Sequence, residues 1–232
     1  VGSTALGTLN YDGAGYNTAV GYAAGTAVTT GANNTLIGGQ AGDAINTGYS
    51  NVAVGVGAAG ATTVGFSNIA LGHGALATNV DGARSVAIGT SALNTQEPAT
   101  AISMYNVAIG HDAGKSITTG VQNTIVGGLA GDSLAASNLN TAVGYQALTA
   151  ATTADLNTAI GAQTLYTNIL SDRNVAVGYG ALYTHNQATS IDSYNTAIGY
   201  SAGVSVSTGI RNTLIGGLAG DALTDADYNV AV

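Results

Sequence analysis

Residues 140–148 read NTAVGYQAL, and near-copies recur along the chain, among them NVAVGYGAL at 174–182 and SVAIGTSAL at 85–93. The residue after the Asn is β-branched, the third after it is Val, Ile or Leu, and the fourth is Gly wherever the chain reaches it. Such alternation is typical of a β-strand, whereas recurrent Gly and β-branched residues disfavour a helix. The repeat therefore predicts an all-β fold built from one unit used many times.

The copies follow one another at 17 residues, except for two steps of 21 where four residues are inserted. Five copies form a superrepeat of 89 residues. This period predicts an imperfect leading repeat at 1–16, superrepeats at 17–105 and 106–194, and the start of a third at 195–232. The copies start at Asn17, Asn34, Asn51, Asn68, Ser85, Asn106, Asn123, Asn140, Asn157, Asn174, Asn195, Asn212 and Asn229.

A 17-residue unit is too short for two-helix repeats, which need about 33 residues or more. It fits a coil of two short strands joined by two turns, with successive coils stacked about 4.8 Å apart. We therefore expect a parallel β-solenoid, or β-roll, in which each Asn stacks on the Asn of the next coil. Asn tolerates left-handed backbone at a turn, and its amide can hydrogen-bond along the stack. We interpret this Asn ladder as structural.

Neither face of the predicted strand is polar, because successive side chains point to opposite sides. The β-branched residue and the Val, Ile or Leu share one face, which we expect to form a buried column inside the roll. The Ala between them and the Gly after them share the other face, which would let another backbone approach closely. A strand that is apolar on both sides is normally covered on both. We therefore expect self-association, as an oligomer or a filament.

One variant of the repeat, NTLIGGLAGD at 212–221, ends like a calcium-binding turn, but its copies lie 89 residues apart. Calcium-binding rolls hold each ion between adjacent turns, so isolated copies lack the oxygen ligands that the ion needs. We expect no metal, and interpret the acids Asp43, Asp132 and Asp221 as turn or capping residues. We interpret the extra glycines of this variant, Gly39, Gly128 and Gly217, as compensation for the larger Leu36, Ile125 and Leu214.

The composition excludes several functions. The net charge is −8 with only four Lys and Arg residues, which argues against nucleic acid and anionic membranes. Cys is absent, so we expect neither disulfides nor thiolate metal sites, and no cofactor. No run approaches the roughly 20 apolar residues of a membrane span, so we expect no membrane insertion. The acids are scattered, and no nucleophile, base and orienting acid share a local window, so we expect no enzyme and no catalytic residue.

The units NTAVGYQAL, NVAVGYGAL and SVAIGTSAL resemble the head repeats of trimeric autotransporter adhesins of the YadA type. They resemble equally the collar and shaft repeats of bacteriophage tail fibres, and the resemblance covers Asn17 to Val232. It implies a left-handed parallel β-roll, three chains around one axis, and an extracellular, cell-surface or virion-tail location. The function it implies is a structural fibre segment, with adhesion to glycans or a host-cell receptor as a further role.

The four-residue insertions produce the longest connections, at 94–105 and 183–194. Loops on a rigid scaffold often carry binding residues, although a passive surface bulge explains them equally well. The candidate binding residues are Glu97, Pro98, Tyr105, His185, Asn186 and Tyr194. Asn33 begins the sequon Asn33-Asn34-Thr35 and is a candidate glycosylation site.

Two alternatives remain among β-solenoids. An ice-binding solenoid presents a uniform Thr array, whereas the position after the Asn varies between Thr, Val and Ile. A purely architectural, self-assembling filament needs no binding residue, and the sequence leaves this alternative open. The interpretation that the sequence favours is a non-enzymatic fibre segment.

Overall fold

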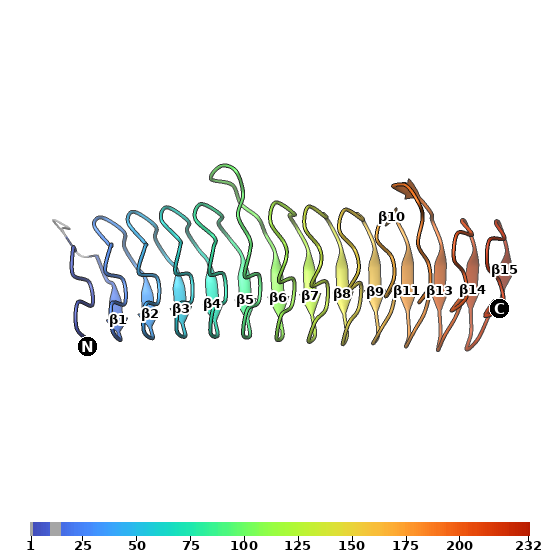
Figure 1. The fold of residues 1–232 in the computed structure, drawn as a ribbon, viewed down its shortest axis with the longest axis horizontal. Helices are drawn as coiled ribbons and strands as arrows, with labels where there is room; N and C mark the ends of the chain where they lie inside the picture. The colour runs from blue at the N-terminus through green and yellow to red at the C-terminus, as the bar shows by residue number, and fades with distance from the viewer. Residues whose placement is uncertain (1, 10–14) are drawn as a thin grey trace. The chain divides into compact units, whose positions relative to one another are not determined.

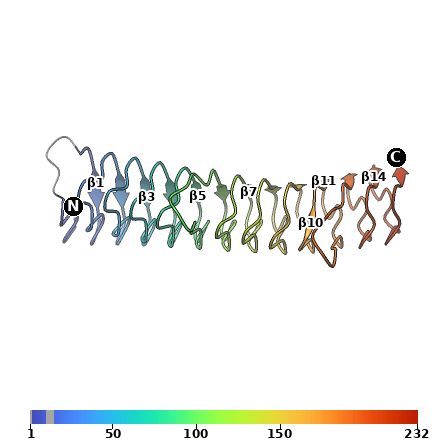
Figure 2. The same cartoon turned by 90° about the horizontal axis from the view of Figure 1, so that it is seen from above.

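The computed structural model describes residues 2–9 and 15–232, and the chain divides into two compact units, residues 1–119 and 120–232. The described residues contain no helix. The first unit holds β1 (Thr18–Val20), β2 (Thr35–Ile37), β3 (Val52–Val54), β4 (Ile69–Leu71), β5 (Val86–Ile88) and β6 (Val107–Ile109). The main strands of the second are β7 (Thr124–Val126), β8 (Thr141–Val143), β9 (Thr158–Ile160), β11 (Val175–Val177), β13 (Thr196–Ile198), β14 (Thr213–Ile215) and β15 (Val230–Ala231). Within each unit these strands lie side by side (Figures 1 and 2).

The strand pairs within each unit are parallel, and the paired residues are 17 apart in sequence. Across the insertions the separation is 21, as between Val86 and Val107 and between Val175 and Thr196. The spacing of the repeats in the sequence therefore equals the spacing between paired residues in the sheet. The predicted parallel β-solenoid with 17-residue coils is confirmed. The division by superrepeat describes the sequence period and stays a prediction.

The prediction of two strands per coil is wrong. Each coil contributes one strand to the main sheet, and the rest consists of turns closed by short backbone bonds, such as Ala41 N–H to the Gly38 carbonyl (3.3 Å). Among the described residues a second strand pair forms only at the second insertion, where β10 (Ser171–Asp172) pairs in parallel with β12 (Ile191–Asp192). Repeated left-handed residues curl the chain too tightly for a second extended segment in every coil.

The coil turns at fixed positions of left-handed backbone. The residue before each ladder Asn has φ between 45° and 59°, as at Tyr16 and Arg84. The ladder Asn does not have positive φ, which corrects the expectation that it would occupy the left-handed position. The Gly four residues after it has φ between 125° and 139°. A Cβ on Gly55 would also lie 2.4 Å from the carbonyl oxygen of Gly72, so both conformation and space require glycine here.

The two faces of the sheet are the reverse of the expectation. The Ala in the middle of the strand is fully buried, as at Ala53 and Ala159. The aliphatic residue beside it points outward, and Ile160 and Val20 keep 39% and 44% of their surface exposed, while Val54 is half-buried. The predicted buried column of Val, Ile and Leu is therefore wrong. A coil with one strand and several tight turns encloses a narrow interior, which favours the small Ala at this position.

The larger strand residue of the NTLIGG variant is accommodated inside the roll. Leu36 is fully buried, and a Cβ on Gly25 or Gly42 would lie 2.7 or 2.8 Å from its side chain. Leu214 has the same relation to the two glycines beside it. The compensating glycines therefore lie eight residues after the Asn. A Cβ on Gly39 or Gly217 would meet nothing within 4 Å and one on Gly128 would meet only Tyr145, so the predicted compensation by these three glycines is wrong.

Candidate functional site

The outer face of the sheet carries two rows of side chains along the strands of each unit. The first and third strand positions point outward and contain only Thr, Val, Ile and Leu. They are half-buried or exposed, with 37% exposure at Ile69 and 39% at Ile198. Exposed tyrosines precede or follow the strands: Tyr16, Tyr22, Tyr105, Tyr145, Tyr179, Tyr194, Tyr200 and Tyr228. We call these rows, with their tyrosine border, the outer face.

The outer face is comparable in size to the largest apolar patches on soluble proteins. Six or seven described strands per unit at about 4.8 Å spacing, each about 10 Å long, give about 300 Å² in each unit without the tyrosine border. The largest apolar patch on a soluble monomer is typically about 300–600 Å² and is often functional. The outer face is therefore the candidate contact surface.

The Asn ladder runs inside the roll. In most coils the backbone N–H of the ladder Asn donates to the Oδ1 of the Asn one coil earlier, at 2.9 Å from Asn157 to Asn140. The Nδ2 of the same Asn140 donates to the Ala154 carbonyl at 2.8 Å, which ties the start of the strand to the following turn. Equivalent backbone bonds start at Asn34, Asn51, Asn68, Asn140, Asn174, Asn195, Asn212 and Asn229. These amides satisfy buried backbone groups that the turns leave without sheet partners.

The ladder changes at Ser85, whose side chain is too short to continue it. Gln96, from the first insertion loop, is fully buried and replaces the missing amide. Its Oε1 accepts from the Ser85 hydroxyl (3.1 Å) and from Asn106 Nδ2 (2.9 Å), and its Nε2 donates to Asn79 Oδ1 (3.1 Å). Sequence reasoning missed Gln96. The available signal was that the only break in the Asn series coincides with the first insertion.

His185 occupies the position of Gln96 in the second superrepeat, 89 residues later. It is fully buried, with Nε2 3.5 Å from the Nδ2 of Asn195, while its Nδ1 has no hydrogen-bond partner among the described residues. Burial lowers the pKa of His185 to about 4, an effect that the backbone of Ser207 opposes only in part. The imidazole is therefore neutral and inaccessible, and its assignment as a surface binding residue is wrong.

The other candidate loop residues are mostly used by the fold. Pro98 is buried, which removes it from the candidate binding residues. Glu97 Oε2 accepts the Val80 N–H at 2.6 Å. Asn186 Oδ1 likewise accepts the Ile169 N–H at 3.1 Å. Both side chains therefore satisfy backbone groups of the preceding coil. Apart from Thr184 and the two tyrosines that end the loops, the exposed loop residues are 99–102 and 188–190, which contain only Ala, Thr, Ile and Ser.

Tyr105 and Tyr194 remain exposed, at 53% and 47%. Each lies beside an arginine of the preceding coil: the Arg84 guanidinium is 5.8 Å from the Tyr105 ring centre, and Arg173 is 5.8 Å from that of Tyr194. These distances are typical of cation–π contacts. The arginines thus hold tyrosines that project from left-handed backbone at the ends of the insertion loops.

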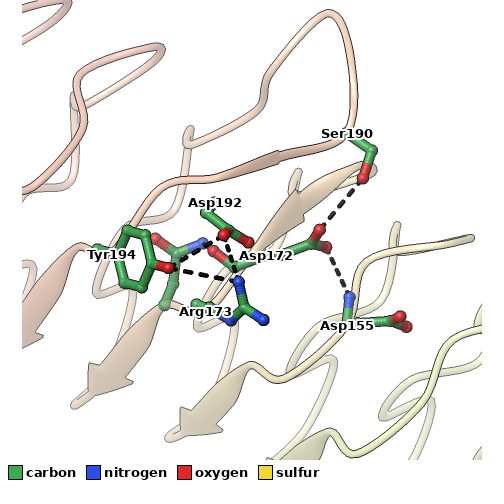
Figure 3. Close-up of polar contacts among 7 residues, drawn as sticks. Asp155, Asp172, Arg173, Ser190, Asp192 and Tyr194 are labelled. Carbon is green, nitrogen blue, oxygen red and sulfur yellow. Dashed lines mark hydrogen bonds and ion pairs between the residues drawn. The ribbon is translucent and has the colours of Figure 1, made fainter.

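A polar cluster surrounds Tyr194 (Figure 3). Arg173 forms an ion pair with Asp192, and the Tyr194 hydroxyl donates to Asp192 Oδ2 at 3.0 Å. The charge of Asp192 raises the pKa of Arg173. Asp172 accepts from the Ser190 hydroxyl (3.1 Å) and from a backbone N–H of the preceding coil, and burial raises its pKa. In the first superrepeat the positions of Asp172 and Asp192 hold Ala and Ser, so the cluster is specific to one loop.

The acids of the NTLIGG variant do not converge. Burial raises the pKa of Asp43, while Asp132 is within 3.4 Å of the Ser133 hydroxyl and Asp221 is exposed. Among residues 2–9 and 15–232, no three His, Asp or Glu side chains come together as metal ligands. Asn33 is exposed and borders the outer face, so a glycan there would lie beside that face.

No helix in the described part of the chain is long and apolar enough to cross a membrane. No protein-family model matches the sequence, and no curated protein matches it. The interpretation of the site therefore depends on the repeat motif and on the geometry of the outer face.

Proposed function

We propose that this protein is an architectural segment of a fibre, held together by contacts between copies of the chain through the outer face. The observation that supports this proposal is the outward orientation of the aliphatic strand residues, such as Ile160 and Ile198. Burial of these two rows of uncharged, mostly aliphatic side chains would stabilise the contact by about 25 cal/mol for each Å² of apolar surface removed from water. A neighbouring copy that presents the same rows offers a matching apolar surface.

The regular register supports an architectural role. Each coil repeats the backbone pairing and the Asn ladder of its neighbour, so the fold extends without contacts distant in sequence. The buried side chains inside each roll are mainly Ala, Leu and Ile, and the polar ones are bonded mostly to the backbone. This interior suits a stiff rod better than it suits a ligand site.

The location and the number of chains in this proposal follow from the resemblance. Trimeric autotransporter heads and phage tail-fibre shafts combine such repeats with three chains around an axis, on a cell surface or a virion. We propose the same extracellular setting and a homotrimer. Adhesion to a glycan or a host receptor has weaker support, because the exposed loop residues 99–102 and 188–190 carry no charge.

Sedimentation equilibrium tests the proposal. The chain should sediment as a multiple of 22.5 kDa. Two acids on the outer face, Ile160→Asp with Ile198→Asp, should shift the protein to monomer, because each carboxylate would be desolvated in the contact. The matched control adds the same two charges to an exposed loop, as Ala188→Asp with Thr189→Asp, and should leave the mass unchanged.

A folded wild-type chain that sediments at 22.5 kDa across the accessible concentrations would refute the fibre proposal. If the outer-face variant and the loop control dissociate to the same extent, the chains do not associate through the outer face. Circular dichroism on each variant verifies that the β-structure persists.

A further inference from the structure

Three glycines on the outside of the chain have no explanation within one chain. Gly39, Gly128 and Gly217 lie five residues after their ladder Asn and lack the left-handed φ that requires glycine. A Cβ on Gly39 or Gly217 would meet nothing within 4 Å, and one on Gly128 would make only an ordinary contact with Tyr145, at 3.7 Å. Glycine loses more conformational freedom on folding than any other residue, so its use here needs a reason. We call these three positions the glycine notches.

The same position is occupied in every other complete copy of the repeat. Those residues are Tyr22, Val56, His73, Thr90, His111, Tyr145, Ala162, Tyr179 and Tyr200. Side chains there are therefore compatible with the coil. The notches recur at a period of 89 residues although the space beside them is open, so the fold of a single chain does not account for them.

Three exposed tyrosines recur with the same period. Tyr16, Tyr105 and Tyr194 are 78%, 53% and 47% exposed, and left-handed backbone projects each of them just before a ladder Asn. Each lies 23 residues before a notch, in the preceding coil. We call them the tyrosine knobs. A Cβ on any of the three notches would meet no knob within 4 Å, so a chain does not fill its own notches.

We propose that each tyrosine knob inserts into a glycine notch of a neighbouring copy and thereby sets the axial register between chains. This inference rests on the proposed self-association and specifies its contacts. We assign each notch to a tyrosine of a second copy. The chain itself carries large, exposed tyrosines that recur every 89 residues, as the notches do. A knob and a notch belong to different rows, so the contact is head-to-tail around an axis, and repeating it closes a ring.

The glycines then have a physical reason. Complete burial of an aromatic side chain removes about 150–250 Å² of surface from water. Tyr105 and Tyr194 are already about half-buried in their own chain, so insertion into a notch would remove about half of that area, provided that no Cβ blocks entry. The remaining copies, with Tyr, Val, His, Thr or Ala at this position, offer no comparable space. A shift of one coil between chains would place knobs against these side chains, so the 89-residue period selects one register.

Filling the notches tests the proposal. The triple variant Gly39→Tyr, Gly128→Tyr and Gly217→Tyr should fold, because the backbone is ordinary and the space is open in one chain. We expect its association to weaken at least 10-fold in sedimentation equilibrium. The matched control places three tyrosines in the same row of other coils, as His73→Tyr, Thr90→Tyr and Ala162→Tyr, and should change association less than 3-fold.

A cross-linking measurement keeps the test independent of folding effects. The chain has no Cys, so Tyr194→Cys and Gly217→Cys can be introduced on separate, co-expressed chains. A short bis-maleimide should join these two chains, whereas Asp225→Cys paired with Gly217→Cys should give no product. The inference would be overturned if the Tyr194→Cys and Gly217→Cys pair gave no more cross-linked product than the Asp225→Cys and Gly217→Cys pair.

The outcomes separate the two proposals. A monomeric wild-type chain would refute self-association itself. An oligomeric wild type whose notch variant associates as tightly as the control would refute the knob-and-notch contact and leave the fibre proposal standing.

Discussion

At position 185 a histidine occupies an interior position that Gln96 occupies in the preceding superrepeat. Gln96 makes hydrogen bonds with both ends of its amide, whereas His185 approaches Asn195 through Nε2 and has no described partner for Nδ1. The low pKa of about 4 reflects this burial, because the imidazolium would lose its hydration. The second superrepeat therefore contains a pH-sensitive position that the first lacks.

His185 predicts a loss of stability in acid. Its pKa is about 4 when folded and about 6.5 when unfolded, so the unfolded chain binds the extra proton between these values. The stabilisation is complete above about pH 6.5 and decreases by about 3 kcal/mol as the pH falls to about 4. Urea unfolding of wild type and of the His185→Gln variant at pH 7 and pH 4.5 measures this effect.

The variant His185→Gln carries the residue found naturally at the equivalent position 96, so it is a conservative control. Its free energy of unfolding should depend less on pH than that of the wild type, because it lacks the buried imidazole. Some pH dependence should remain, because the carboxylates titrate in both proteins. Identical pH dependence of the two proteins would show that His185 is accessible to protons in the folded state.

Among the elements of the coil, the strand followed by Gly is the least tolerant of change. Gly55 has φ of 137°, and a Cβ there would lie 2.4 Å from the Gly72 carbonyl oxygen. Gly55→Ala should therefore destabilise the protein by about 3 kcal/mol or more, since both the backbone and the adjacent coil must move. Thermal unfolding at a concentration low enough to keep the chain dissociated measures this.

Gly39→Ala is the matched control, because it adds the same atom to a glycine with ordinary φ and open space. We expect a change in the stability of the coil of about 0.5 kcal/mol or less, or a small gain. A loss at Gly39 as large as the loss at Gly55 would contradict the positions of these two glycines in the coil.

The sequence predicts the strands well, because the period of 17 fixes which residues pair, as for Thr141 with Thr158. It does not predict which face is inside. Both faces of NTAVG are apolar, so periodicity alone does not distinguish the buried Ala159 from the outward Ile160. Which face is buried depends on the width of the coil. The left-handed residues at the turns determine that width, and the hydrophobic pattern does not reveal it.

The candidate site was predictable only in part. The insertions identify the loops, and the 89-residue period identifies Tyr105 and Tyr194 as recurrent. Polarity suggested that His185 would face solvent, yet it is buried because the ladder beside it accommodates a polar side chain. Pro98 is buried as well, and sequence gave no measure of how closely the loop packs on its own coil.

The proposed fibre requires that another copy of the chain cover the outer face. Ile160 is 39% exposed in the single chain and lies in one of the two outward rows. If copies associate through these rows, a group at this position is accessible only in the dissociated chain. The absence of Cys allows the accessibility of a single introduced thiol to be measured.

The most direct measurement is the rate at which a maleimide reagent labels Ile160→Cys, compared with Asp225→Cys on an exposed turn. The account predicts that the thiol at 160 reacts at least 10-fold more slowly than the thiol at 225 in concentrated protein, and that dilution to monomer removes most of this difference. Equal labelling rates at both positions at every concentration would show that the outer face remains in water, and would contradict the account.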